Sequence, residues 1–144
     1  MAKSKRLEPI VNLARNSERD AVKALGDALQ TLNSQIERLD QLIDYKAEYA
    51  ERLNSSGSKG INVQQLNEYR EFIDKLTLAI EQQEQIVDQA RQTLDEKKRF
   101  WFAKRGRSKA LDAVLDRYLE NEQKQLDKKE QNEIDDRNNR PGRG

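Results

Sequence analysis

The side chains that most often carry out chemistry in proteins are scarce in this sequence. Its 144 residues include no cysteine and no histidine. Disulfides, thiol nucleophiles, imidazole proton shuttles and zinc sites built on Cys or His are therefore excluded. Carboxylates remain, but pairs such as Asp40 with Asp44 and Asp135 with Asp136 fall on polar helix faces with no pocket implied. We expect no enzymatic activity, no cofactor and no metal site.

A glycine-containing stretch at 57–60, Gly-Ser-Lys-Gly, superficially resembles a phosphate-binding loop. It lacks the glycine spacing of that loop, and no strand precedes it. A turn between two helices is the better interpretation.

A run of basic and aromatic residues from Lys97 to Lys109, here called the basic segment, is the other chemical candidate. It carries seven positive charges, no negative ones and three adjacent aromatic side chains. Such segments can bind nucleic acid or an anionic membrane surface. The whole chain, however, has 27 basic and 26 acidic residues, and this balance argues against a dedicated nucleic-acid binder. A solvated helix with Trp101 in its packed face is the favoured interpretation, with nucleic acid or membrane binding as the alternative.

The composition indicates which elements position these residues. Charged residues make up 37% of the chain and apolar residues 35%, with only 6 glycines and 2 prolines. This balance is typical of long helices rather than of a turn-rich sheet protein. No stretch approaches the roughly 18 consecutive apolar residues of a membrane span, and no signal peptide follows the basic start. We expect a cytoplasmic protein.

The sequence between residues 55 and 61, Ser-Ser-Gly-Ser-Lys-Gly-Ile, is the only clear break. We predict a first helix over about 9–54, with Pro9 at its first position, and a second over about 62–135. Asn62 is the predicted N-cap of the second helix, with Gln65 three residues later as in a capping box. Residues 1–136 form one domain in this prediction, and 137–144 form a disordered tail.

Apolar residues repeat with steps of three and four in both helices. This period of 3.5 residues predicts an all-α fold, in which two long helices form an antiparallel left-handed coiled-coil hairpin. Leu25 is then expected opposite Leu94, and the last stretch of helix two, past about Val114, has no partner in the chain. The residues expected at the packed a and d heptad positions are Val22, Leu25, Leu29, Leu32, Ile36, Leu39 and Ile43 in helix one, and Ile73, Leu76, Ile80, Gln83, Val87, Ala90 and Leu94 in helix two.

The neighbouring g positions are also apolar, unlike the e positions. They include Ala14, Ala21, Ala28, Leu42 and Tyr49 in helix one. Two helices cannot cover such a strip, so we expect an exposed apolar surface near the turn. Partner docking and self-association into a four-helix bundle both explain it. The residues of this expected surface are Leu42, Tyr45, Tyr49, Phe72 and Ala79, with Leu76 beside them.

The same residues carry a resemblance to a known family. Residues 42–49, Leu-Ile-Asp-Tyr-Lys-Ala-Glu-Tyr, and 69–76, Tyr-Arg-Glu-Phe-Ile-Asp-Lys-Leu, resemble two motif blocks of FliJ-type flagellar export proteins. Residues 79–82, Ala-Ile-Glu-Gln, extend the second block. The resemblance covers roughly Asp20 to Asn132.

This resemblance implies a soluble, non-enzymatic, stalk-like component of the flagellar type III export apparatus. Its implied partners are the hexameric export ATPase, the cytoplasmic domain of the membrane export gate, and export chaperones. It would bind no nucleic acid and would associate with the inner membrane at the flagellar base only through these partners. Carried over to this chain, the gate-docking residues would be Leu42, Tyr45, Tyr49, Phe72, Leu76, Ala79 and Gln83. By analogy and from the geometry of the hairpin, the residues that contact the ATPase or another acidic partner would be Lys97, Lys98, Arg99, Trp101, Lys104, Arg105, Arg107 and Lys109.

Overall fold

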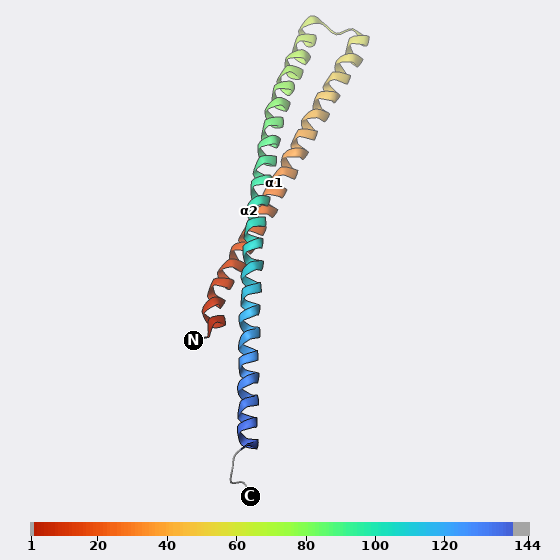
Figure 1. The fold of residues 1–144 in the computed structure, drawn as a ribbon. Helices are drawn as coiled ribbons and strands as arrows, with labels where there is room; N and C mark the ends of the chain where they lie inside the picture. The colour runs from red at the N-terminus through yellow and green to blue at the C-terminus, as the bar shows by residue number, and fades with distance from the viewer. Residues whose placement is uncertain (1, 140–144) are drawn as a thin grey trace. The chain divides into compact units, whose positions relative to one another are not determined.

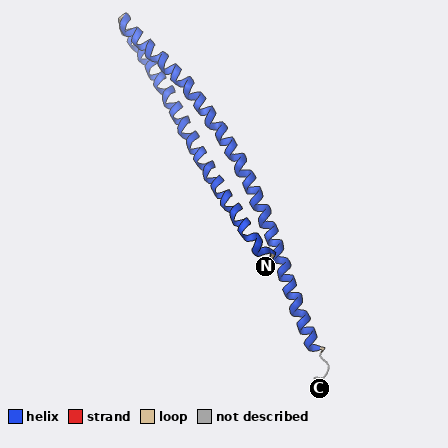
Figure 2. Cartoon of the chain, turned by 90° about the vertical axis from the view of Figure 1, so that its left-hand side faces the viewer, coloured by secondary structure: helices blue, strands red, loops and turns tan. Residues whose placement is uncertain are grey.

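A computed structural model of the chain describes residues 2–139, and nearly all of them are helical. Helix α1 spans Lys3–Lys59 and helix α2 spans Val63–Asn138 (Figures 1 and 2). Only residues 2, 60–62 and 139 of the described part lie outside the two helices. The prediction of an all-α fold made of two long helices packed against each other is confirmed.

Helix α1 begins earlier than predicted. Pro9 lies inside the helix, not at its first position. A proline removes one backbone hydrogen bond, here the one to the carbonyl of Lys5, and this loss is tolerated near a helix start. The residues before Pro9 are held in place by α2, because the buried Ser4 is hydrogen-bonded to Glu122.

Helix α1 also ends later than predicted, because residues 55–59 remain helical. The hydroxyl of Ser58 donates a hydrogen bond to the carbonyl oxygen of Ser55 at 2.8 Å. The chain then turns at Gly60, whose φ of 82° lies in the left-handed region that favours glycine. The predicted cap of α2 is confirmed: the Asn62 side-chain oxygen accepts a hydrogen bond from the backbone N–H of Gln65 at 2.7 Å.

The described chain separates into two compact units. The turn unit, Lys23–Arg99, is an antiparallel helical hairpin that contains the turn. Leu25, Ile36 and Leu39 pack against its buried cluster, which includes Leu94, the residue expected opposite Leu25. The buried cluster of the turn unit consists of Ala28, Leu32, Val87, Ala90 and Leu94.

Within the described residues, the terminal unit comprises 2–22, which includes the start of α1, and 100–139, which includes the end of α2. These two segments also run antiparallel, since Ser4 contacts Glu122 while Arg15 contacts Asp112. The Arg15 guanidinium lies 2.7 Å from the Asp112 carboxylate, with both side chains partly exposed. Its most buried side chains are mainly small, namely Ser4, Val11, Ala14, Ala21 and Ser108.

The packed face of α1 differs from the prediction. Leu29, expected in the seam between the helices, is 48% exposed, whereas Leu32 is 8% exposed. At the g positions Ala14, Ala21 and Ala28 are buried, whereas the a positions Val22, Leu29 and Ile43 are about half exposed. Ile36 is the a position that packs against the buried cluster, as predicted. Alanines at g let the helix backbones approach closely, and this favours them over larger side chains at a. In α2 the predicted a and d positions Leu76, Gln83, Val87, Ala90 and Leu94 are buried as expected.

The paired part of α2 extends further than predicted. Because α1 starts at Lys3, residues as late as Glu122 have a partner in α1. From Leu126 to Asn138 every residue of α2 is exposed. Helix α2 also continues into the predicted disordered tail, 137–144, as far as Asn138. Residues 140–144 of that tail lie outside the described residues.

Candidate functional site

Four aromatic side chains of the turn unit, two from each helix, are called the aromatic patch: Tyr45, Tyr49, Tyr69 and Phe72. Tyr45 lies one helical turn before Tyr49 on α1. The Tyr49 ring centroid lies 4.3 Å from that of Phe72 and 6.4 Å from that of Tyr69. These tilted arrangements are favourable for aromatic pairs. The Arg52 guanidinium lies 5.2 Å from the Tyr49 ring centroid, within cation–π distance.

An open groove of about 520 Å³ follows this patch toward the turn. Its floor is aromatic, and its rim carries Arg52, Gln65 and Glu68. Tyr69 was not among the residues of the expected apolar surface, although it lines this groove. Its position three residues before Phe72, on the same face of α2, was the available signal.

The seven residues predicted to dock the export gate differ in accessibility. Tyr45 is 55% exposed and Phe72 is 40% exposed. Leu42, Tyr49 and Ala79 are half-buried, whereas Leu76 and Gln83 are buried in the seam. A partner that approaches this face would therefore meet the aromatic rings first, whereas Leu76 and Gln83 contribute to the packing between the helices.

Gln83 has a specific interaction inside the turn unit. Its side-chain amide donates hydrogen bonds to the backbone oxygen of Gln35 at 3.0 Å and to the Gln35 side-chain oxygen at 2.7 Å. Gln83 is only 4% exposed. Because a buried amide without partners is costly, this bond pair favours the alignment in which Gln35 lies opposite Gln83. Sequence reasoning missed the pair, although both glutamines interrupt otherwise apolar positions.

The basic segment does not form one uniformly charged face. Lys97, Lys98, Arg99, Arg107 and Lys109 are exposed, whereas Trp101, Lys104 and Arg105 are half-buried. Two of the cations lie over aromatic rings of the same helix. The Lys104 ammonium is 5.1 Å from the Phe100 ring centroid, and the Arg105 guanidinium is 5.4 Å from that of Trp101.

Trp101 occupies the seam position that the sequence predicted for it, and it is half-buried. Its indole N–H is shielded from solvent and has no hydrogen-bond acceptor among the described residues. Leaving such a donor unpaired costs about 1–3 kcal/mol. The apolar ring packing and the Arg105 contact offset part of this cost.

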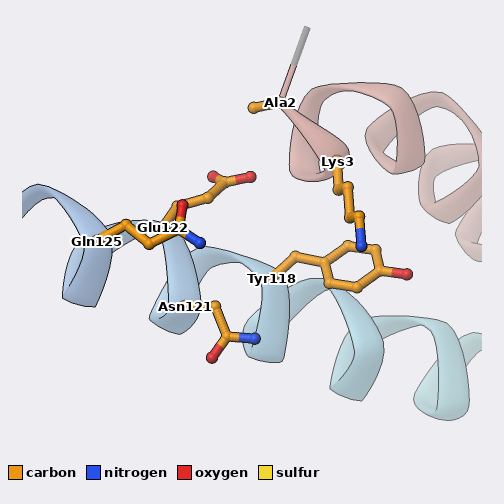
Figure 3. Close-up of a pocket in the computed structure, with 6 residues that line it drawn as sticks. All are labelled: Ala2, Lys3, Tyr118, Asn121, Glu122 and Gln125. Atoms are coloured by element: carbon orange, nitrogen blue, oxygen red, sulfur yellow. The ribbon is translucent and has the colours of Figure 1, made fainter.

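At the start of α1, a shallow groove of about 360 Å³ lies between Ala2 and Lys3 on one side and α2 on the other (Figure 3). The Lys3 ammonium sits 5.7 Å from the Tyr118 ring centroid. The Glu122 carboxylate accepts hydrogen bonds from the Ser4 backbone N–H at 3.2 Å and from the Ser4 hydroxyl at 2.7 Å. It thereby satisfies one of the free N–H groups at the helix start.

The same two hydrogen bonds lower the pKa of Glu122 below its ordinary value, because both stabilise the charged form. The nearby Lys5 charge acts in the same direction, and partial desolvation opposes it. Sequence reasoning missed this contact, because it placed the helix start at Pro9 and so left Ser4 without a structural role.

Within residues 2–139 there is no group of three or more acidic side chains placed to hold a metal ion. In that same range, neither helix has a window long and apolar enough to cross a membrane. The two candidate sites are the aromatic patch in the turn unit and the basic segment of α2.

Two comparisons with known proteins, one with a family model and one with individual relatives, point to the same family. The family model described as flagellar FliJ protein matches residues 3–142. The flagellar FliJ protein of Escherichia coli (strain K12) is 33% identical over 117 residues, which covers 81% of this chain and 80% of that protein. The flagellar FliJ protein of Salmonella typhi matches with the same identity and the same coverage.

Proposed function

The chain belongs to the flagellar FliJ protein family, and from that premise we propose that it links the export ATPase to the export gate. Membership of this family makes it a component of the flagellar export apparatus. In the proposal, the aromatic patch binds the cytoplasmic domain of the membrane export gate. The basic segment contacts the hexameric export ATPase, and the protein also receives export chaperones. It works in the cytoplasm, held at the inner membrane only through these partners.

The observation that carries the proposal is the exposure of Tyr45 and Phe72. Both rings lie on the face next to the seam, and both keep a large exposed fraction. Tyr49 connects the two helices beneath them through its contact with Phe72. Exposed aromatic side chains on a rigid support are typical of binding hot spots, because little side-chain entropy is lost when they are buried.

The proposed mechanism requires no bond-making chemistry. The protein would contact one partner through the basic segment and another through the aromatic patch. It can couple the two partners if the affinity of each contact depends on the conformational state of the partner. Helices suit this role, since their backbone hydrogen bonds are internal and their surface side chains remain available.

The test of the gate-docking site is the double variant Tyr45→Ser with Phe72→Ser. It should remain helical by far-UV circular dichroism and lose binding to the purified gate domain, with loss of motility in cells. The matched control is Leu78→Ser, which removes an exposed apolar side chain of α2 outside the aromatic patch. Unchanged gate binding by the double variant would contradict the site, as would equal loss in the control.

The ATPase contact is tested by charge reversal in the basic segment. Lys98→Glu with Arg99→Glu should weaken capture of the export ATPase and leave gate binding unchanged. Both side chains are exposed, so reversing their charges should not disturb the helix packing. An added export chaperone in the same capture experiment tests the third partner. Retained ATPase capture by the charge-reversed chain would place that contact elsewhere.

A further inference from the structure

A groove in the terminal unit combines aliphatic and cationic side chains, and we call it the terminal groove. It has a volume of about 420 Å³. Ile10 and Leu13 lie one helical turn apart on α1, and Lys104 and Arg107 lie one turn apart on α2. Ala14 and Ser17 complete the lining.

The aliphatic side chains of this groove are not needed for the packing of the terminal unit. Ile10 is 45% exposed and Leu13 is 68% exposed, whereas their neighbours Val11 and Ala14 are buried in the seam. Phe100, which is also exposed, lies one turn before Lys104 and adds apolar surface beside the groove. Large apolar side chains left exposed together on a helical surface commonly mark a docking site.

The cations of the groove are available for a partner of opposite charge. Arg15 forms an ion pair with Asp112, and Arg91 forms one with Asp88. Neither pair involves Lys104 or Arg107. Lys104 and Arg107 both belong to a stretch of thirteen residues, 97–109, that contains seven basic and no acidic side chains. The groove therefore has an aliphatic wall and a positively charged wall.

We propose that the terminal groove binds an acidic amphipathic helix of a partner protein. Its apolar side chains, spaced three and four residues apart, would lie against Ile10 and Leu13. Its carboxylates would pair with Lys104 and Arg107, which are themselves one turn apart and match the spacing of a second helix. This inference deepens the proposed contact between the basic segment and an acidic partner, and it rests on the proposed function for the role of that contact.

The chemistry of the groove favours a protein helix over nucleic acid. Nucleic-acid strands are held by phosphate contacts and by bases stacked on aromatic faces. The apolar side chains that line this groove are aliphatic, and the Phe100 ring beside it is covered on one side by the Lys104 ammonium. Aliphatic side chains flanked by cations match the face of an amphipathic helix that carries leucines and glutamates.

The probe is a fluorescein-labelled synthetic peptide of about 18 residues, five helical turns. It carries leucines at helical spacing and glutamates on both flanks. Two matched peptides are used: one with every glutamate replaced by lysine, and one with the same composition in scrambled order. Binding to the full chain is measured by fluorescence anisotropy at low and high salt.

Only the acidic amphipathic peptide should bind, and salt should weaken its binding. Leu13→Ser should lower its affinity about tenfold, because the buried leucine contact is lost. Lys104→Glu with Arg107→Glu should lower it at least about tenfold. Lys128→Glu with Lys129→Glu, charge reversals in the exposed end of α2, are the controls and should leave binding unchanged.

Several outcomes would overturn the inference. Equal binding of the scrambled peptide, or an unchanged affinity in Leu13→Ser, would show that the peptide is held only by general attraction between charges and not by the groove. Stronger binding of a DNA oligonucleotide, or of phosphatidylserine vesicles, that is insensitive to Leu13→Ser would assign the cations to those ligands instead. Self-association of the chain that is abolished by Leu13→Ser would identify a second copy as the occupant.

The outcome of the peptide experiment can be distinguished from success or failure of the proposed function. The Tyr45→Ser, Phe72→Ser variant should bind the peptide like the unmodified chain, because those residues belong to the turn unit. Peptide binding with no capture of the export ATPase would refute the ATPase assignment and leave the groove intact. ATPase capture that survives Leu13→Ser and Lys104→Glu would separate the ATPase contact from the groove.

Discussion

In both the turn unit and the terminal unit a segment of α1 packs against a segment of α2, but the contacts between the two segments differ in kind. In the turn unit, large apolar side chains such as Leu32, Val87 and Leu94 form a continuous buried cluster. In the terminal unit the most buried side chains are mainly small, and two polar links, Ser4 with Glu122 and Arg15 with Asp112, join the helices. The difference indicates that stability is concentrated in the buried cluster of the turn unit, since buried apolar area contributes more than partly exposed polar links.

The polar links also differ between the units. Gln35 and Gln83 are neutral and meet inside the apolar seam of the turn unit. The links of the terminal unit involve charged groups that solvent reaches. A buried neutral link selects the alignment of two helices, whereas an exposed charged link depends on salt and pH.

The largest expected difference between the units comes from truncating one buried aliphatic side chain in each. Leu94→Ala should lower the free energy of unfolding by about 3 kcal/mol, since it leaves a cavity in the cluster. Val11→Ala in the terminal unit should cost about 1–2 kcal/mol, because fewer buried carbons are lost. Urea unfolding followed by circular dichroism measures both. Trp101, the single tryptophan, reports on the terminal unit by fluorescence. Equal costs would remove the distinction between the units.

The packed face of α1 gives the next largest contrast. Leu32→Ala should cost about 2 kcal/mol, because this leucine is buried in the cluster. Leu29→Ala should cost less than about 1 kcal/mol, because nearly half of Leu29 is already exposed to solvent. Thermal and urea unfolding of the two variants provide the comparison. A larger cost at Leu29 would restore the a and d positions of the sequence prediction.

The buried glutamine pair should have a smaller effect on stability. Gln83→Ala should cost about 1–2 kcal/mol, because two hydrogen bonds are lost and the Gln35 side-chain oxygen loses a partner. In a Gln35→Ala background the same change should cost less, since one of those bonds is already absent. A double-mutant cycle measures this difference directly. Additive costs would show that the two side chains do not interact.

The smallest effect is expected at the start of α1. The pKa of Glu122 is lowered from its ordinary value of 4.5, so its carboxylate stabilises the folded chain above that pH. This contribution should be lost as pH falls through the lowered pKa, and Glu122→Gln should remove much of that pH dependence. Hydrogen exchange of the amides near Ser4, measured between about pH 3 and 7, checks the prediction. An unchanged pH dependence in the variant would separate Glu122 from the stability of this end.

The sequence predicted the parts of the fold that depend on spacing. Steps of three and four fixed the helical class and the packed face of α2, and Asn62 fixed the start of that helix. The packed face of α1 was predicted in part. Leu25, Leu32, Ile36 and Leu39 pack as expected, but Leu29 was predicted wrongly, because a hydrophobic pattern ranks Leu29 above Ala28. Close helix packing selects the smaller side chain instead. That preference depends on the opposing helix surface and is not visible in one helix alone.

The candidate site was predictable to a similar extent. Tyr45 and Phe72 emerged from the apolar flank of the pattern and are exposed in the structure. The link between Gln83 and Gln35 and the contact of Glu122 with Ser4 were not foreseen. Each joins residues far apart in the sequence and depends on the alignment of two helices to within one residue, which a heptad pattern does not define.

The pairing of chain segments in the two units has a consequence for synthesis on the ribosome. The hydrogen bond between Gln35 and Gln83 joins residues 48 positions apart, whereas that between Ser4 and Glu122 joins residues 118 positions apart. Roughly 80 residues separate the two segments of the terminal unit, and they take about 4–16 s to make at about 5–20 residues per second. The turn unit has all its residues once Arg99 has been added. The first-made segment, 2–22, must wait for the last-made one, and Val11 stays uncovered in the meantime. The emerging chain therefore exposes its future terminal seam for seconds, a period in which its solubility depends on the charged residues that surround Val11.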